Sequence, residues 1–489
     1  MADQSRARVR TPWLLALIVL AAVAARVGLV LHRPLWHDEA FTEWAARLPS
    51  PDLAAALRRD SGPPLFYVLE RPFARAVTGR ENEALLRVLS LAASLALLLA
   101  APTLPAGRAR RWWIALAASS CLVNLYAAEA RAYALLALAG LVIFLLGVEA
   151  PPTPFRLAAL FAAAAAALWL HYLALFAVLS ALVLAAARRR WSCAFTLALA
   201  SAAFAPWLPV LRAQPPEAMG WMREGAEAAL PGFVSALGGV GRVPAPFGLA
   251  PPGAVVAGAL VGAALAVVVA AAARSDRAVR DAALFVLFAL GLSLAASLWR
   301  PVAFAGRAEM AVLPVWIWAV ARAAGERRSI GVVAGVSVAI GLVATLFVSF
   351  GPHPRSTQAS AVSSVARLAR PGDRVLAGPG FYLPALVEGS RGRLRAEVSA
   401  LPASDAAHPG WFVATTPGTG EEEEIAGRMA ALPPDGRLFL LLPPSHQTPG
   451  VMRTLFSRGT VREIVRQPDG VLLVWSASAD GVAKTDRVS

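Results

Sequence analysis

Long apolar runs recur along this sequence, and they limit the folds it can adopt more strongly than any motif does. The hydrocarbon core of a bilayer is about 30 Å thick, so a helix that crosses it needs about 20 apolar residues. The runs that approach this length are 12–32, 84–104, 112–128, 132–149, 155–170, 172–187, 192–211, 253–272, 282–299, 308–324 and 329–350. We therefore expect a mainly α, polytopic membrane protein with about 11 transmembrane helices.

Composition supports the same class of protein. Hydrophobic residues make up 57% of the 489 positions and charged residues only 16%, which excludes an ordinary soluble protein. The two cysteines, Cys121 and Cys193, lie in separate apolar runs. This placement argues against a disulfide framework or a cysteine metal site, and we expect both to be small buried hydrophobic residues.

The basic residues give the chain a formal net charge of +15, and their positions predict its topology. Cytoplasmic loops of membrane proteins are enriched in Lys and Arg. With the N-terminus in the cytoplasm, alternate crossings place every strong basic cluster on that side: 108–111, 188–190, 274–280 and 322–328. The opposite face then receives loop 33–83, turn 129–131, His171 with Tyr172, loop 212–252, turn 300–307 and all residues after 350. We expect a multi-pass protein of the cell (inner) membrane that has no nucleic-acid partner.

The last part of the chain has a different pattern. Here the apolar runs are strand-length and are separated by Gly, Pro and Asp, at 373–377, 410–414, 437–442 and 471–475. Helical patterns lie between them at 358–370, 421–432 and 449–458. The sequence therefore predicts a transmembrane domain over 1–350 and a small C-terminal α/β soluble domain over 351–489, on the extracytoplasmic side.

Polar side chains gather in the segments that the predicted topology assigns to the outer face. Asp38 and Glu39 directly follow the first apolar run, and adjacent carboxylates so close to a membrane are costly unless something uses them. Asp60 precedes a Gly-Pro-Pro-Leu-Phe-Tyr segment in the same loop. The other candidates are Arg131, Tyr133, His171, Tyr172 and Arg307. Carboxylates, guanidiniums, imidazole and phenols together can form an acid/base and anion-binding site.

This ordered set of motifs resembles the integral-membrane GT-C glycosyltransferases, specifically glycosyltransferase family 39 and the Rgt-like group. The resemblance covers residues 1–350 and rests on the Asp38-Glu39 pair, the Pro63–Tyr67 segment, the Glu129–Tyr133 turn, the His171-Tyr172 pair and Arg307. The chain departs from the family in two places. Relatives commonly carry a basic residue where this chain has Gly62, and a tyrosine where Ala308 follows Arg307.

The resemblance implies a GT-C fold and transfer of a sugar from a polyprenyl-phosphate carrier to a lipid, glycan or protein acceptor on the extracytoplasmic face. It also implies an inverting displacement in which Asp38 is the general base and Glu39 orients Asp38 or the acceptor. Arg131 and Arg307 would bind the donor phosphate, because a phosphate leaving group needs charge stabilisation more than a proton. Asp60, Tyr133, His171 and Tyr172 complete the expected donor or substrate site.

Several alternatives remain open at the level of sequence. Asp38 suits a helix N-cap, Arg131 suits an ion pair with Glu129 or with a neighbouring helix, and His171 with Tyr172 suits an interfacial aromatic belt. No cofactor is implied, and a divalent metal lacks a recognisable ligand motif. The main alternative function is a multi-pass transporter or flippase of lipid-linked glycans, which typically places its charges near the bilayer midplane. A polymerase of lipid-linked glycans and a phosphotransferase also fit the same compartment.

Overall fold

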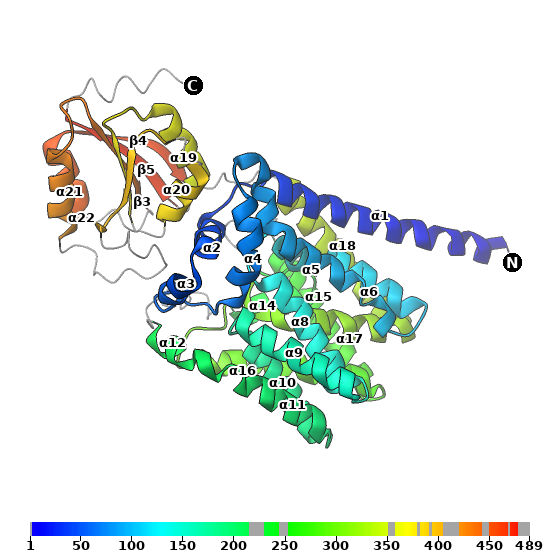
Figure 1. Cartoon of the computed structure of the whole chain (residues 1–489). Coiled ribbons are helices and arrows are strands. Elements are labelled where there is room, and N and C mark those ends of the chain that lie inside the picture. The colour runs from blue at the N-terminus through cyan, green and yellow to red at the C-terminus, as the bar shows by residue number, and fades with distance from the viewer. Residues whose placement is uncertain are drawn as a thin grey trace.

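The structure is a computed structural model, and it describes residues 2–214, 229–243, 253–350, 357–378, 382–390, 394–403, 420–442, 449–467 and 470–477. The chain is mainly helical up to residue 350 and forms a five-stranded sheet in its C-terminal part. The helices make one bundle, from which the N-terminal helix α1 (Ala2–His32) extends, and the sheet lies beside the bundle next to α2 (Figure 1). The expected combination of a helical bundle with a C-terminal α/β unit is confirmed.

Every predicted apolar run contains helix, but not every run makes one long helix. Within the described residues, six stretches are long and apolar enough to cross a membrane: Trp13–His32, Asn82–Thr103, Trp191–Ala213, Ala254–Ala273, Arg277–Ala296 and Arg328–Phe350. Three shorter apolar helical stretches are Tyr133–Glu149, Pro154–Leu170 and Ala174–Ala187. The protein is therefore multi-pass, and the expected number of about 11 crossings is supported by length and composition for six of them.

The predicted run 112–128 is divided into two helices, α6 (Arg108–Ser119) and α7 (Cys121–Ala127). At the break the Cys121 amide donates a hydrogen bond to the carbonyl oxygen of Gly239, at 2.9 Å. The side-chain amide of Asn124 donates to the carbonyl oxygens of Ala118 and Ser120, both at 2.9 Å. The break is tolerated because side chains and a neighbouring segment provide partners for the backbone groups that it frees.

The predicted run 282–299 also differs from the observed helix, α16 (Arg277–Ala296), which begins earlier. Oδ1 of Asp276 accepts hydrogen bonds from the amides of Ala278 and Val279, at 2.8 and 3.3 Å, and caps the helix. The first turn contains two arginines, so a rule based on apolar length places the start of the helix too late.

Helix α17 (Leu313–Glu326) is buried along nearly its whole length, and α6, α16, α8 (Tyr133–Phe144), α14 (Ala229–Leu237), α15 (Ala254–Ala273) and α18 (Arg328–Phe350) pack against it. The other bundle helices are α5 (Val88–Leu98), α9 (Pro154–Leu170), α10 (Ala174–Ala187), α11 (Trp191–Ala202) and α12 (Leu208–Ala213). Large apolar side chains on the outside of the bundle are exposed, for example Phe195 at 71% and Leu260 at 70%. Such an outer surface suits contact with lipid.

The predicted polar loop 33–83 is folded into three helices before the first turn of α5: α2 (His37–Arg47), α3 (Ser50–Leu57) and α4 (Leu65–Ala76). Arg47 on α2 donates hydrogen bonds to the carbonyl oxygens of Ala74 and Val77 at the end of α4, at 3.2 and 2.9 Å. The N-cap position of α2 is Trp36, so the interpretation of Asp38 as an N-cap residue is wrong.

The C-terminal sheet has the strand order β2-β1-β3-β5-β4. Its elements are α19 (Thr357–Leu368), β1 (Arg374–Ala377), α20 (Leu383–Ser390), β2 (Glu397–Ala400), α21 (Glu421–Ala430), β3 (Arg437–Leu442), α22 (Pro449–Arg458), β4 (Thr460–Gln467) and β5 (Gly470–Ser476). Strand β1 is parallel to β2 and β3, whereas β5 is antiparallel to β3 and β4. The predicted strand 410–414 lies outside the described residues, and β2, β4 and α20 were not predicted.

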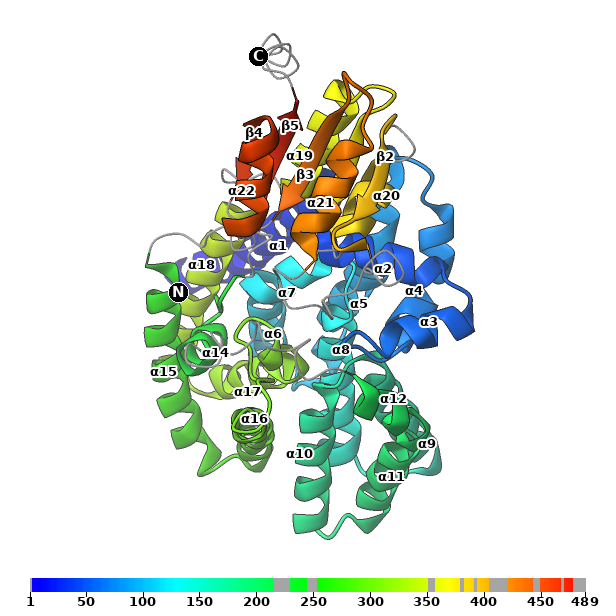
Figure 2. The ribbon, with the colours of Figure 1, turned by 90° about the vertical axis from the view of Figure 1, so that its left-hand side faces the viewer.

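Helices cover both faces of this sheet, as Figure 2 shows from a second direction. Phe439 and Leu441 of β3 pack with α19 and α20, while Leu438 and Leu440 pack with α21 and α22. Successive strand residues point to opposite faces, so a strand that is covered on both sides is apolar throughout.

Candidate functional site

A cavity of about 800 Å³ lies in the bundle, and five of the predicted site residues line it. These are Arg131, Tyr133, His171, Tyr172 and Arg307, and they are joined by Tyr67 and by residues 61–63 of the loop between α3 and α4. The rest of the wall is mostly apolar and comes from α10, α11, α12 and α16, with Leu179, Phe204, Leu211, Leu292 and Trp299 among its residues. The cavity therefore combines a polar group of side chains with a long apolar surface.

Arg307 is placed by a tight turn ahead of α17. Gly306 has a φ of 91°, and a Cβ at this position would lie 2.4 Å from the carbonyl oxygen of Arg242, so only glycine fits. The amide of Gly306 donates a hydrogen bond to Oε1 of Glu309 at 2.8 Å, and its carbonyl oxygen accepts one from the hydroxyl of Tyr126. The turn is thus fixed on both sides, and it directs the Arg307 guanidinium to the cavity wall.

The guanidinium of Arg307 lies between two kinds of partner. Its central carbon is 5.6 Å from the ring centroid of Tyr133 and 5.6 Å from that of Phe304. One of its terminal nitrogens is 3.6 Å from Oδ2 of Asp38. Opposite charge and neighbouring phenols outweigh the effect of burial and raise the pKa of Arg307 above its ordinary value, so this group stays a cation.

Asp38 lies beside Arg307 and is not among the residues that line the cavity. It is the second residue of α2 and only 1% exposed, and its Oδ1 lies 3.6 Å from Nε2 of His37. Neither of its carboxylate oxygens accepts a hydrogen bond from the part of the chain that the structure describes. The structure therefore brings Asp38 next to a wall residue, while Asp38 itself does not line the cavity.

Glu39 has a different environment from its neighbour. Arg87 donates two hydrogen bonds to the two carboxylate oxygens of Glu39, both at 2.8 Å, and Arg33 lies 2.9 Å from Oε1. The backbone amide of Ala130 donates a third hydrogen bond, at 3.0 Å. Burial alone would raise the pKa of Glu39, but the Arg33 and Arg87 guanidiniums hold it below its ordinary value. Glu39 thus joins α2 to the turn before α8 through the Ala130 amide, and to the start of α5 through Arg87, a residue that the sequence did not indicate.

Arg131 lies on that turn and has carboxylates and phenols around it. Burial would lower its pKa, but Asp38, Tyr67, Tyr133 and Asp60 raise it well above the ordinary value. Asp60 is only 3% exposed, and burial raises its pKa to about 6 although Arg131 opposes that shift. Asp60 is therefore placed as a counter-charge to Arg131, outside the residues that line the cavity.

The expected alternative, in which Arg131 pairs only with Glu129, is not what the structure shows. Within the described part of the chain, neither carboxylate oxygen of Glu129 accepts a hydrogen bond. Burial raises the pKa of Glu129 to about 7, and the cations that oppose this shift are Arg307 and Arg33. The Arg131 guanidinium is thus available to a ligand in the cavity.

His171 and Tyr172 follow α9 and close another part of the wall. Nδ1 of His171 accepts a hydrogen bond from the amide of Leu173 at 3.2 Å, and its ring centroid is 5.1 Å from that of Tyr133. Burial, with Arg131 and Arg307 nearby, lowers the pKa of His171 to about 3. The imidazole is therefore neutral, and Nε2 is its remaining N–H donor.

No group of three or more His, Cys, Asp or Glu side chains among the described residues could hold a metal ion.

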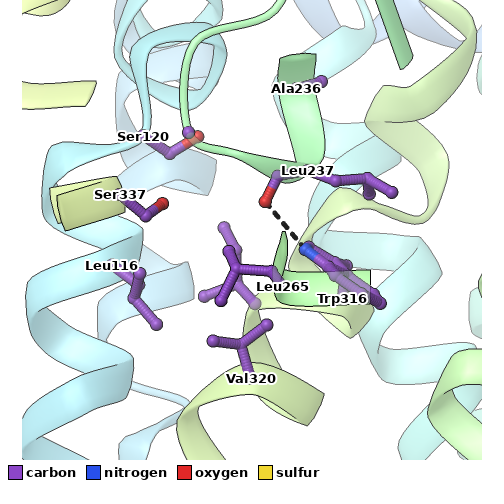
Figure 3. A pocket seen from close by; sticks show the side chains of 10 residues that line it. Leu116, Ser120, Ala236, Leu237, Leu265, Trp316, Val320 and Ser337 are labelled. Atoms are coloured by element: carbon purple, nitrogen blue, oxygen red, sulfur yellow. Dashed lines mark hydrogen bonds between the residues drawn. The ribbon is translucent and has the colours of Figure 1, made fainter. Parts of the chain in front are cut away.

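A second void, of about 10 Å³, lies between α6, α14, α15, α17 and α18, where Trp316 donates a hydrogen bond to the carbonyl oxygen of Leu237 at 2.9 Å (Figure 3). Since this volume is about that of a single water probe, the void is a packing defect and not a substrate site.

Comparison with known proteins identifies the fold. No family model and no curated protein matches the sequence. The crystal structure of ArnT from Cupriavidus metallidurans bound to undecaprenyl phosphate aligns over 98% of this chain and 100% of that chain, with a TM-score of 0.58 and 15% sequence identity. The apo structure of the same protein aligns over the same shares, with a TM-score of 0.46 and 14% identity. At this identity the first alignment shows a shared fold, of the GT-C type.

Proposed function

We propose that this protein is a membrane glycosyltransferase that moves a sugar from a polyprenyl-phosphate carrier to a lipid, glycan or protein acceptor. The observation that carries the proposal is the cavity, which joins two guanidiniums to a long apolar wall. A polyprenyl phosphate has the same division between an anionic head and an apolar chain. The structural neighbour ArnT was solved with undecaprenyl phosphate, a lipid of this class, bound to it.

The polar part of the cavity suits a phosphate group. Arg131 and Arg307 both line it and both remain cationic, because carboxylates and phenols raise their pKa values. Guanidinium groups bind phosphate oxygens through paired, charge-assisted hydrogen bonds. The neutral His171 adds a donor without adding charge. This set stabilises the negative charge that collects on the phosphate as the sugar leaves.

The apolar part suits a chain that remains in the bilayer. Four lining residues also belong to the outer surface of the bundle: Leu175 is 42% exposed, Leu208 and Leu292 are each 37% exposed, and Trp299 is 85% exposed. The apolar wall is therefore continuous with the surface that faces lipid. A lipid-linked donor can lie along such a wall, whereas a water-soluble sugar nucleotide gains nothing from it.

The chemistry that follows is a single displacement. The acceptor hydroxyl oxygen attacks the anomeric carbon, the bond between this carbon and the phosphate oxygen breaks, and the polyprenyl phosphate leaves with that electron pair. The hydroxyl proton passes to Asp38 as general base, and the configuration at the anomeric carbon is inverted. Arg307 moves from Asp38 towards the phosphate during this step, which exposes the base as the leaving group gains charge.

We also propose an orientation of the protein in the membrane and a division of the chain into two domains. The cytoplasmic side carries the basic clusters, and the cavity opens to the other side, together with a C-terminal domain at 351–489. This domain contacts α2 through an ion pair of 3.2 Å between Glu388 and Arg47 and through Tyr382, whose ring centroid is 6.1 Å from that of His37. We propose that it shapes the entrance for the acceptor. Membership of glycosyltransferase family 39 rests on the ordered motifs alone.

A flippase of lipid-linked glycans is the second candidate, because a lipid-sized cavity in the bundle also suits transport. Liposomes that contain the purified protein, a radiolabelled polyprenyl-phosphate sugar and an extract of membrane acceptors distinguish the two functions. A glycosyltransferase gives a labelled covalent product with inverted configuration, and Arg131→Met loses it while Arg108→Met, at an exposed cytoplasmic position, keeps it. Label that crosses the bilayer without a new covalent product would establish the flippase instead.

A further inference from the structure

The polar part of the cavity includes a segment that has no helix or strand of its own. Ser61, Gly62 and Pro63 line the cavity between the end of α3 and the start of α4. The same loop carries Asp60, the buried counter-charge to Arg131. A loop that forms part of a binding wall must be held by contacts with the rest of the protein, because irregular backbone lacks a ladder of internal hydrogen bonds.

The contact that holds this loop comes from Gln214, which follows α12 far away in the sequence. Its side chain is 6% exposed, and both ends of its amide group are used. Nε2 donates a hydrogen bond to the carbonyl oxygen of Leu57 at 2.7 Å and a longer one to that of Gly62 at 3.4 Å. Oε1 accepts a hydrogen bond from the hydroxyl of Tyr172 at 3.0 Å. Gln214 thus joins two segments of the cavity wall without lining the cavity.

The direction of the amide is fixed by its partners. The hydroxyl of Tyr172 accepts a hydrogen bond from Nε1 of Trp207 at 3.0 Å, so it is left to donate towards Gln214. The two carbonyl oxygens on the other side need a donor, and the NH2 group is the only donor of the Gln214 amide. Leu57 is the last residue of α3, and its carbonyl oxygen also accepts a longer hydrogen bond from the backbone amide of Asp60, at 3.4 Å. The short bond from Gln214 and the bond from Asp60 thus meet on one carbonyl group at the end of the helix.

We infer that Gln214 is a positioning residue for the donor head group. It sets the distance between loop 60–63 and Tyr172, and through the loop it sets the position of Asp60 beside Arg131. This inference rests on the proposed function, since the ligand that the wall would hold is the sugar-phosphate head of a polyprenyl donor. Because Gln214 acts through the wall and not on the reacting atoms, its loss weakens donor binding and leaves the chemical step intact.

The test uses two variants of the full-length protein in detergent, with undecaprenyl phosphate as the binding probe. Gln214→Leu removes all three hydrogen bonds of the amide at similar volume, and Tyr172→Phe removes the one from Tyr172. Each weakens binding of undecaprenyl phosphate about tenfold, the effect of losing one buried hydrogen bond. The double variant is no weaker than Gln214→Leu alone, because both changes break the same bridge. Arg212→Met, an exposed neighbour on α12, leaves binding unchanged.

Transfer assays give the second readout. Gln214→Leu raises the KM for the donor and leaves kcat at saturating donor within about twofold of wild type. If Gln214→Leu does not fold, the same comparison is made with Gln214→Asn, whose shorter side chain cannot reach both partners of the bridge. Wild-type binding in Gln214→Leu, or a loss of kcat with an unchanged KM, would overturn the positioning role while the proposed function stands. A wild-type protein that does not bind undecaprenyl phosphate would overturn the proposed function first, and this inference with it.

Discussion

The carboxylate of Asp38 lies 3.6 Å from the Arg307 guanidinium and accepts no hydrogen bond from any residue that the structure describes. Most buried polar groups in folded proteins are hydrogen-bonded, because an unmatched one is costly to remove from water. Free lone pairs on a buried carboxylate are what a general base requires. The pair of residues thus combines the two roles that the displacement needs, a proton acceptor and a cation for the leaving group.

Replacing the Asp38 carboxylate tests this pairing directly. Asp38→Asn keeps the size of the side chain and removes its basicity, so we expect sugar transfer to fall by about 10²-fold to 10⁴-fold. Binding of undecaprenyl phosphate should persist, because Arg131 and Arg307 remain. Asp52→Asn, at an exposed position on α3, is the matched control. Equal transfer by Asp38→Asn and wild type would remove Asp38 from the chemistry.

Glu39 should behave differently from its neighbour. Glu39→Gln leaves the Arg33 and Arg87 guanidiniums buried without their counter-charge, and breaking a buried ion pair in this way costs about 3–5 kcal/mol. We expect a clear drop in the unfolding temperature in detergent and in the yield of folded protein. A Glu39→Gln protein that melts like wild type but transfers no sugar would instead place Glu39 among the catalytic groups.

The pH dependence of stability has a specific source on α4. The Glu70 carboxylate is fully buried, both of its oxygens lack a hydrogen bond within the described residues, and burial together with the Glu39 charge raises its pKa to about 8. A carboxyl whose pKa is raised by folding keeps its proton up to a higher pH in the folded state than in the unfolded state. Its contribution to stability is therefore complete below the unfolded pKa, about 4.5, and is lost as pH rises to about 8.

Glu70→Gln removes this loss, because an amide does not ionise. We expect the variant to melt at a higher temperature than wild type at pH 8 and at nearly the same temperature at pH 5. Glu423→Gln, an exposed change in the C-terminal part, should alter neither value. Thermal unfolding of the three proteins across this pH range is the measurement, and a constant difference between Glu70→Gln and wild type would refute the assignment.

Gly62 allows a gain of function to be tested. It lines the cavity, and a Cβ at this position would lie 3.4 Å from the Tyr67 hydroxyl, an ordinary contact. Gly62→Lys should therefore fit and tighten binding of undecaprenyl phosphate about tenfold at low salt, because a hydrogen bond to a charged group is worth more than a neutral one. The advantage should shrink as salt is added.

Gly62→Met is the control for that experiment, since it adds a chain of similar length without the charge. If the lysine variant binds no more tightly than the methionine variant, the phosphate does not lie near this part of the wall.

The lengths of the apolar runs predicted which segments are helical better than they predicted where each helix begins and ends. Runs such as 329–350 match a helix closely, because crossing a bilayer requires continuous hydrogen-bonded backbone. The division at Ser120 depends on Gly239 and Asn124, and those contacts exist only after the bundle has assembled. In the sheet, β3 was recognisable because both of its faces are covered. The edge strand β4 carries Arg462 and Glu463 and has no such run.

For the site too, the sequence could not predict contacts that form only in the folded bundle. Alternation of topology assigned the segments of Arg131, His171 and Arg307 to one face of the membrane, and the structure brings these three residues to one cavity. Topology could not predict that Asp38 and Glu39 have different environments. Neighbouring residues on a helix point in different directions, and their tertiary partners decide what surrounds each side chain. Arg87 and Gln214 were missed for a related reason. Each is a single polar residue beside an apolar run, and its partners are distant in sequence.

The contact between Arg307 and Asp38 bears on how long a sugar donor would last in the proposed site. A guanidinium does not accept a proton, so water beside Arg307 meets no base at that position. In the proposed mechanism Asp38 acts only once the donor phosphate has drawn Arg307 away from it. Hydrolysis of a waiting donor would then be slow, and a lipid with a misplaced phosphate would occupy the site without reacting.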